Sequence, residues 1–481
     1  MQATDMAEPK LSNAAPDLAR DEISLTLEQN WDDMFSQDRA HLEKWQLAAA
    51  RRRFEELAPQ VKALKSQADS GGVSQISSLN DLVPLLFNHA AYKSYPMSLL
   101  ENSRFDMLTR WLDGMTSIDL SGVNARECTG IDNWLETLER ETPLQIYHTT
   151  GTTGKLSFIP RTTLERDMWD EAFLKIFERF GDEPGEKLGG PDGARVPVVF
   201  PGVRGGRYAT QRIIDRFAEY VAPTPGQCYT ASNDYLSADV VSLSGRVRVA
   251  QAKGDLSSMK LTEPMRLALK QYLTEMERRP QEMSEFFSRM VDKLRGERVF
   301  LIWQAAYLVR AANAGMPQGL SNIFAPNSFG NTGGGNKDLV LPDNWLNLIR
   351  DFTGIQNWEV SYGMSEMVGV LPQCPEGYYH IQPYFIPFLL DPETGAILPR
   401  EGRQSGRFAA LDLLAQTYWG GVISSDKVTI EWDRACGCGR KGAHIHDDIV
   451  RYAAEVTGDD KVTCSATVDN NDAALHQLLA G

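Results

Sequence analysis

The sequence lacks most features that mark secreted, membrane-spanning and nucleic-acid-binding proteins. Its 481 residues include only six cysteines, far apart except in one Cys-Gly-Cys triplet, which argues for reduced thiols rather than disulfides. No run of about 18 apolar residues is present to cross a membrane. The formal net charge of −15 disfavours nucleic acid and anionic membrane surfaces as partners. We therefore expect a cytoplasmic protein whose partners are small molecules or another protein.

The beginning of the chain also lacks the basic start and apolar centre of a signal peptide. Residues 1–21 are acidic and contain alanine and proline, which predicts a disordered leader. From Leu25 onward apolar residues recur at three- and four-residue steps among charged ones, and further helical blocks extend to Leu138. The pattern predicts a helical N-terminal layer over residues 22–140.

Beyond that layer, short apolar runs alternate with amphipathic stretches. The predicted strands include Val196–Phe200, Val299–Trp303 and Trp358–Tyr362, and the predicted helices cover residues 211–221, 264–278, 281–294, 305–314 and 343–352. Such alternation predicts an α/β fold with parallel or mixed sheets flanked by helices, whose ligands bind at the carboxyl ends of strands. We assign this core to residues 141–430 and a short, atypical C-terminal region to residues 431–481.

One hydroxyl-rich, glycine-punctuated stretch joins two short predicted strands within the core. Its candidate phosphate-binding residues are Thr149, Thr150, Gly151, Thr152, Thr153, Gly154 and Lys155. Glycines let successive N–H groups turn toward an anion, the threonines add hydroxyl donors, and the lysine adds a positive charge. A Walker loop has four residues between its first glycine and its Gly-Lys pair, whereas this stretch has only two, so a switch-type NTPase is disfavoured.

Three further clusters follow at predicted strand ends. Gly333, Gly334 and Gly335 let the backbone pass close to a flat ligand such as a purine. The segment Tyr362-Gly363-Met364-Ser365-Glu366 places a carboxylate after a tight turn, where it can hold Mg²⁺ against phosphate oxygens. Asp426 is placed to accept hydrogen bonds from two ribose hydroxyls.

A second constellation has the residue types of a zinc site. Cys374 and His380 form one short hook, and Cys436 and Cys438 form another. Three thiols and an imidazole make a closed tetrahedral set, with His444 or His446 as alternatives to His380. Buried reduced cysteines beside a core histidine are the other interpretation.

The order of these motifs resembles the adenylate-forming superfamily of acyl-CoA synthetases, adenylation domains and luciferase. The resemblance covers roughly residues 145–450 and extends from Thr-Thr-Gly-Thr-Thr-Gly-Lys through Gly-Gly-Gly and Tyr-Gly-Met-Ser-Glu to the strand-end aspartate. The continuation Lys155–Arg161 and the stretch from Asp391 to Asp426 are similar to the branch of phenylacetate-CoA ligases and the acyl-protein synthetases of bacterial luminescence. Members of the former group carry a similar Cys…His and Cys-x-Cys arrangement.

The resemblance implies a ligase that activates a carboxylic acid with MgATP, forming acyl-AMP, and then transfers the acyl group to a thiol. It implies that Lys155 and the threonines bind the β,γ-phosphates, that the three glycines and Tyr362 line the adenine, that Glu366 binds Mg²⁺ and that Asp426 binds ribose. The acceptor is coenzyme A or a protein cysteine. Transfer to an amine, and a nucleotide-binding or zinc-stabilised scaffold without activity, remain the alternatives.

The end of the sequence departs from the superfamily pattern, in which a large mobile C-terminal domain delivers a lysine to the acyl phosphate. Lys461 is the candidate for that lysine, and Cys464 is a candidate acyl carrier in the tail. His148 either contacts the acyl carboxylate or ends its strand. The acyl pocket is predicted near residues 201–208, 323–335 and 362–370, for an apolar or aromatic acid. A homodimer is expected only as the commonest assembly.

Overall fold

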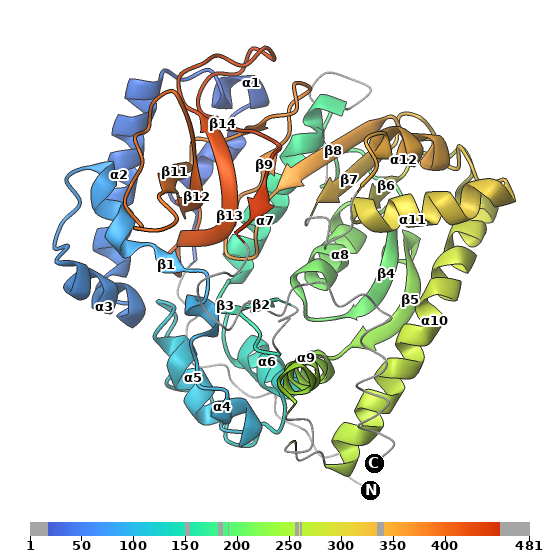
Figure 1. Ribbon diagram of the computed structural model, residues 1–481, viewed down its shortest axis with the longest axis horizontal. Helices are drawn as coiled ribbons and strands as arrows, with labels where there is room; N and C mark the ends of the chain where they lie inside the picture. Colours follow the sequence, from blue (N-terminus) through green and yellow to red (C-terminus); the bar gives the residue numbers. More distant parts are fainter. Residues whose placement is uncertain are drawn as a thin grey trace, which may run out of the picture.

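The computed structural model describes residues 18–149, 154–180, 186–190, 192–254, 259, 262–333 and 341–452. Thr150, Gly151, Thr152, Thr153, Gly334, Gly335, Lys461 and Cys464 lie outside these ranges, as does most of the predicted leader. Two large sheets and a small hairpin organise the described chain (Figure 1). The predicted α/β fold with mixed sheets flanked by helices is confirmed.

The first sheet has six strands in the order β5 (Cys228–Leu236), β4 (Val198–Gly206), β6 (Phe300–Ile302), β7 (Phe329–Gly333), β8 (Asn357–Tyr362) and β9 (Leu371–Pro372). All neighbouring pairs are parallel except β8 and β9. The carboxyl ends of five strands therefore meet at one edge, which is where ligands of such sheets bind.

Both faces of this sheet are covered by helices. Helices α7 (Thr163–Lys175) and α8 (Ala209–Tyr220) lie on one side, and α10 (Glu263–Leu294), α11 (Ala305–Gly315) and α12 (Trp345–Thr353) on the other (Figure 1). Phe300 packs against aromatic rings near α7 and α8, whereas Leu301 joins the cluster with α10 and α12. Burial on both faces explains why Val198–Phe200 and Phe300–Ile302 appear in the sequence as continuous apolar runs.

The second sheet follows the path β10 (Tyr379–His380), β14 (His444–Ile445), β13 (Gly421–Glu431), β12 (Arg403–Asp412) and β11 (Phe385–Leu390). Strands β1 (Phe87–Asn88) and β15 (Val450–Arg451) also pair with β13, of which only β1 is parallel. Helices α2 (Arg39–Leu57) and α3 (Lys62–Gly71) flank this sheet (Figure 1). The amide of Gln46 donates to the backbone oxygens of Pro383 and Phe385, so N-terminal helices pack on the C-terminal sheet.

A third part of the fold lies around the hairpin of β2 (Tyr147–His148) and β3 (Phe158–Ile159). A separate core joins Phe158 to α5 (Phe105–Asp113) and α6 (Ile131–Glu141) and to the first residue of α9 (Ala238–Lys253). Short helical segments elsewhere in the described chain are η1 (Ser24–Glu28), α1 (Trp31–Met34), η2 (Leu79–Leu85), η3 (Ala91–Lys93), α4 (Ser98–Glu101), η4 (Ile176–Phe180), η5 (Pro225–Gln227) and η7 (Met316–Gln318).

Three element boundaries differ from the sequence prediction. Strand β4 continues past Pro201-Gly202 because two register shifts against β5 accommodate a residue that cannot donate a hydrogen bond. Helix α10 runs through Pro280, so the two predicted helices are one. Gly333, predicted to lie just past a strand, is the last residue of β7. None of the described helices combines the length and apolar character that a membrane crossing requires.

Candidate active site and metal centre

Arg161 joins the stretch around Lys155 to the segment that carries Glu366. Its side chain is 1% exposed, and its guanidinium donates to the backbone oxygens of Ser365, at 2.9 Å, and Met367. The guanidinium carbon also lies 4.4 Å from the ring centre of Tyr147 in β2. Two motifs about 200 positions apart in the sequence are therefore neighbours in the fold.

A residue of the second sheet fixes the turn that carries Glu366. The carboxylate of Asp412, at the end of β12, accepts from the N–H groups of Val368 at 2.6 Å and Gly369 at 2.8 Å. Its other oxygen accepts from Leu414 N at 2.9 Å. Burial raises the pKa of Asp412 to about 6, although these three N–H groups favour its ionised form. Asp412 thus fixes the backbone immediately after Glu366.

Glu366 itself lies among cationic side chains. Burial raises the pKa of its carboxyl group, and the charges of Arg161, Lys93 and Arg451 act in the opposite direction. The backbone oxygen of Glu366 accepts from the Tyr418 hydroxyl at 3.3 Å. A partly desolvated carboxylate on a fixed turn is a suitable ligand for a hard divalent cation such as Mg²⁺.

Tyr362 and Asp426 meet where the two sheets adjoin. The Tyr362 hydroxyl donates to Asp426 Oδ2 at 2.8 Å, and Arg451 Nε lies 3.5 Å from Asp426 Oδ1. Burial is the main cause that raises the pKa of Tyr362. The residues predicted to bind adenine and ribose are therefore in direct contact, while Gly363 beside them is exposed.

The described ends of the phosphate-binding stretch are also fixed. Thr149 and Ser157 exchange hydrogen bonds across it, and the Thr149 hydroxyl accepts from Ser157 N at 3.1 Å. Gly154 has a φ of +78°, a conformation that other residues rarely adopt. Lys155 follows it, with Nζ 5.1 Å from the ring centre of Tyr95.

His148 is buried at the end of β2. Its Nδ1 lies 3.3 Å from Thr149 O, its ring centre is 4.2 Å from that of Tyr208, and burial lowers its pKa to about 4. His148 Nε2 and the Tyr208 hydroxyl have no hydrogen-bond partner among the described residues. A neutral imidazole next to an unused hydroxyl can hydrogen-bond a polar ligand group, in addition to ending the strand.

Other unpartnered polar atoms lie at the same edge of the first sheet. Trp303 Nε1 and Gln304 Oε1 follow β6, and Thr332 Oγ1 is in β7; all three are buried without a partner in the described chain. Because buried polar groups are normally hydrogen-bonded, these atoms mark a place for a polar ligand. Gly333 belongs to β7, where a Cβ would lie 2.9 Å from Ser361 O, so its observed role is close strand packing.

Three phenylalanines within or next to the segments predicted to form the acyl pocket pack in the hydrophobic core. Phe200 and Phe329 are at most 1% exposed and pack near α7, while Phe324 packs on the opposite face with α12. Tyr208 and Trp303 are aromatic residues that follow the ends of β4 and β6. An apolar residue beside a motif has the same appearance in sequence whether it faces a ligand or the core, so the acyl pocket stays a prediction.

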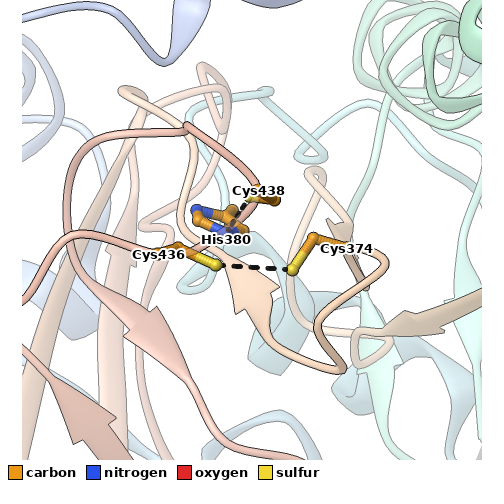
Figure 2. Close-up of side chains that lie close together, drawn as sticks. All are labelled: Cys374, His380, Cys436 and Cys438. Atoms are coloured by element: carbon orange, nitrogen blue, oxygen red, sulfur yellow. Dashed lines mark hydrogen bonds between the residues drawn. The ribbon is translucent and has the colours of Figure 1, made fainter.

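The two cysteine hooks converge on one point (Figure 2). One ligand atom from each of Cys374, His380, Cys436 and Cys438 lies within 4.8 Å of the others. Cys374 Sγ is 3.7 Å from Cys436 Sγ, and Cys438 Sγ is 3.3 Å from His380 Nε2. Among the histidines considered as the fourth ligand, His380 lies with the three thiols. The ring of His444 stacks on that of His380, with 5.3 Å between the ring centres.

Local turns bring these side chains together. Cys374 follows β9, and its N–H donates to Tyr378 O across a turn in which Gly377 has a φ of +82°. Without a cation, burial raises the pKa of Cys436 to about 12 and lowers that of His380 to about 3. A neutral imidazole is what a metal requires, and a bound cation reverses the effect on the thiols. The donor set fits tetrahedral zinc.

Arg161 and Asp412 are the functional residues for which sequence analysis proposed no role. Both are charged residues that end an apolar run, Phe158–Ile159 and Phe408–Leu411 respectively, which is the signal that could have drawn attention to them. Their partners are backbone atoms of a distant segment, and the sequence pattern carries no sign of those contacts.

Comparisons with known proteins give structural similarity only. No protein-family model and no curated protein sequence matches the chain. Similar solved structures include 2-hydroxyisobutyryl-CoA ligase in the postadenylation state, at 12% identity and a TM-score of 0.47, covering 87% of this chain and 69% of that one. ATP-free MatB from Rhodopseudomonas palustris is 11% identical over 65% of this chain and 48% of that one, with a TM-score of 0.32. A red-emitting luciferase from Phrixothrix hirtus is 14% identical, with a TM-score of 0.21 over 30% of this chain and 34% of that one. TM-scores below 0.5 leave the assignment of function to the residues themselves.

Replacing Arg161 tests the connection between the two motifs. We expect Arg161→Leu to lower the free energy of unfolding by about 2–4 kcal/mol, because two buried backbone oxygens lose a charged donor. Urea denaturation followed by tryptophan fluorescence measures the change. Arg166→Leu, a partly exposed arginine one turn into α7, is the control and should cost less than about 1 kcal/mol. Equal losses for both variants would contradict a special role for Arg161.

Metal analysis tests the second centre. The purified protein should contain about one equivalent of zinc, since four ligands make one closed site. The double variant Cys436→Ser/Cys438→Ser should contain none, while Cys228→Ser, which removes a thiol outside the cluster, should retain it. A wild-type protein purified without chelators and free of zinc would rule the metal centre out.

Proposed function

We propose that the protein activates a carboxylic acid with ATP through an acyl-AMP intermediate and then transfers the acyl group to a thiol. The observation that supports this most strongly is the Arg161 bridge, which brings the stretch ending in Lys155 against the turn bearing Glu366. The Tyr362–Asp426 hydrogen bond adds the predicted nucleoside-binding residues to the same region.

In this proposal a carboxylate oxygen of the acid attacks the α-phosphorus of ATP. The bond from that phosphorus to the bridging oxygen breaks, and pyrophosphate leaves with the electron pair. Lys155 neutralises charge on the β,γ-phosphates, and Asp426 holds the ribose hydroxyls with Tyr362 beside the base. Mg²⁺ held by Glu366 would supply charge stabilisation at the phosphate oxygens. The protein's contribution is positioning and electrostatics, which needs no nucleophile in the chain.

His148 and Tyr208 are the candidates for orienting the acid. Their ring centres lie 4.2 Å apart, and the Tyr208 hydroxyl can donate to a carboxylate. Neutral His148, whose Nδ1 donates to Thr149 O, offers Nε2 as an acceptor for a hydroxyl or N–H group of the ligand. Lys461 for the acyl phosphate and Cys464 as an acyl carrier stay predictions, because both lie outside the described residues.

The acceptor is a thiol of coenzyme A or of a protein, with an amine as the rival. A nucleotide-binding or zinc-stabilised scaffold without activity is the alternative from another class. The presence of both Lys155 and Glu366, with the Glu366 segment fixed by buried hydrogen bonds, favours the enzyme over the scaffold.

Isotope exchange separates the enzyme from the scaffold. Wild-type protein should exchange labelled pyrophosphate into ATP only when a suitable carboxylic acid is present. Lys155→Ala and Glu366→Gln should each lower the exchange rate by the equivalent of about 2–4 kcal/mol, because each removes charge stabilisation of the transition state. Lys253→Ala, on an exposed position of α9, is the matched control and should exchange normally. Full exchange by both site variants would overturn the assignment.

Product analysis then identifies the acceptor. With a carboxylic acid that supports exchange, we expect the thiol of coenzyme A or of a protein fraction to attack the acyl carbon of the acyl-AMP and release AMP. The product is a thioester, which hydroxylamine cleaves at neutral pH. A product that resists hydroxylamine and contains the added amine would assign the second step to amide formation instead. Mass spectrometry of the products distinguishes the two.

A further inference from the structure

We propose that Arg246, on helix α9, is a second cation that binds the polyphosphate of the nucleotide together with Lys155. This inference rests on the proposed function and adds to it a residue to which neither the motifs nor the resemblance assigns a role. It concerns a binding residue and not a participant in bond making.

Helix α9 packs directly on the last described glycine of the phosphate-binding stretch. A Cβ built on Gly154 would lie 2.4 Å from the backbone nitrogen of Arg246 and 2.6 Å from its Cγ. The Ser242 hydroxyl, one turn earlier, donates to Gly154 O at 2.6 Å. Position 154 therefore has to be glycine, and the close approach that glycine permits places Arg246 against the residue preceding Lys155.

The Arg246 side chain is half-buried, and the Nε of its guanidinium is fully buried. Its Nε has no hydrogen-bond partner among the described residues, and no salt bridge to it is found there. Burial lowers the pKa of Arg246, while Glu101, Asp239 and Tyr95 act to raise it. Asp239 is already engaged, since its carboxylate accepts from the backbone nitrogens of Ile131 and Asp132. A buried cation in this state gains by acquiring an anion.

Tyr95 brings the two cations into one neighbourhood. Its ring lies under Lys155 Nζ, its hydroxyl donates to Leu156 O at 2.8 Å, and the charge of Arg246 acts on that hydroxyl. Tyr95 is 0% exposed, so its ring is held in place where it packs against residues 154–156. The positively charged side chains of Lys155 and Arg246 therefore come from different segments of the sequence and lie near the same short piece of backbone.

The chemistry of the ligand explains why two cations are needed. Phosphate oxygens accept parallel hydrogen bonds from the planar fork of an arginine, which a lysine ammonium cannot supply. Lys155 is the only lysine or arginine in the stretch from residue 147 to 158. Arg246 adds charge and geometric selectivity for a phosphate chain from outside the motif.

Direct binding tests the proposal. The probes are inorganic tripolyphosphate and MgATP, each titrated calorimetrically into the full chain in the absence of acid. We expect Arg246→Gln to weaken the binding of both by about 10- to 100-fold, as for the loss of a charged hydrogen bond. Arg248→Gln removes the same charge about 200° around the helix and should bind like wild type. Arg246→Lys, which keeps the charge but not the fork, should fall between them.

The control measurements distinguish a binding role from a structural one. The unfolding midpoint of Arg246→Gln should stay near that of wild type, or rise, because a poorly compensated buried charge has been removed. In the exchange assay its KM for MgATP should increase more than its kcat falls, while the KM for the acid is unchanged. Lower stability with unchanged tripolyphosphate affinity in Arg246→Lys would show a packing role and overturn the proposal.

Failure of this inference is separable from failure of the proposed function. If wild-type protein exchanges pyrophosphate and Arg246→Gln binds both probes like wild type, only the role of Arg246 is wrong. If wild-type protein binds tripolyphosphate in an Arg246-dependent way but shows no acid-dependent exchange, the phosphate site stands and the ligase assignment is wrong. If wild-type protein binds neither probe, both are wrong.

Discussion

The buried guanidinium of Arg161 is the interaction on which the candidate site depends. Burying a charge is costly unless hydrogen bonds compensate for it, and Arg161 obtains this compensation from backbone oxygens of the Glu366 segment and the ring of Tyr147. The contacts that compensate for burying the charge of Arg161 also fix the hairpin of β2 and β3 against the end of β8. Asp412 holds that segment from the other side through backbone N–H groups. Glu366 is therefore presented on a backbone fixed at both flanks.

Local motifs and apolar runs were the parts of this protein that the sequence could predict. The strand around Phe300 appears as a continuous apolar run because both faces of the first sheet are buried there. Lys155, Glu366 and the cysteine hooks lie in short patterns whose chemistry is visible by residue type. The roles of Arg161 and Asp412 could not be predicted, because their partners are backbone atoms of distant segments. Such contacts leave no signature in the pattern of side chains. Strand β4 was cut short because Pro201 normally ends a strand, whereas here a register shift absorbs it.

Gly154 and Gly333 both lie in glycine-containing motifs, but the structure requires glycine at the two positions for different reasons. Gly154 combines a φ of +78° with contact to Arg246 and Ser242, so both backbone conformation and space exclude a side chain. Gly333 has an ordinary strand conformation, and only the approach of Ser361 O excludes a Cβ. The first glycine brings a helix and its cation to the proposed phosphate site, and the second tightens a strand pair. Sequence composition alone cannot separate these two reasons.

The metal centre and the candidate nucleotide site share one structural junction. Cys374 follows β9, which pairs with β8 next to Tyr362, while Cys436 follows β13, the strand that carries Asp426. The contact between Cys374 and Cys436 and the hydrogen bond between Tyr362 and Asp426 thus join the same two sheets at two points. Holding four ligands on one zinc ion would restrain the sheets relative to each other. The distance between Tyr362 and Asp426 would then depend on the metal even though neither residue binds it.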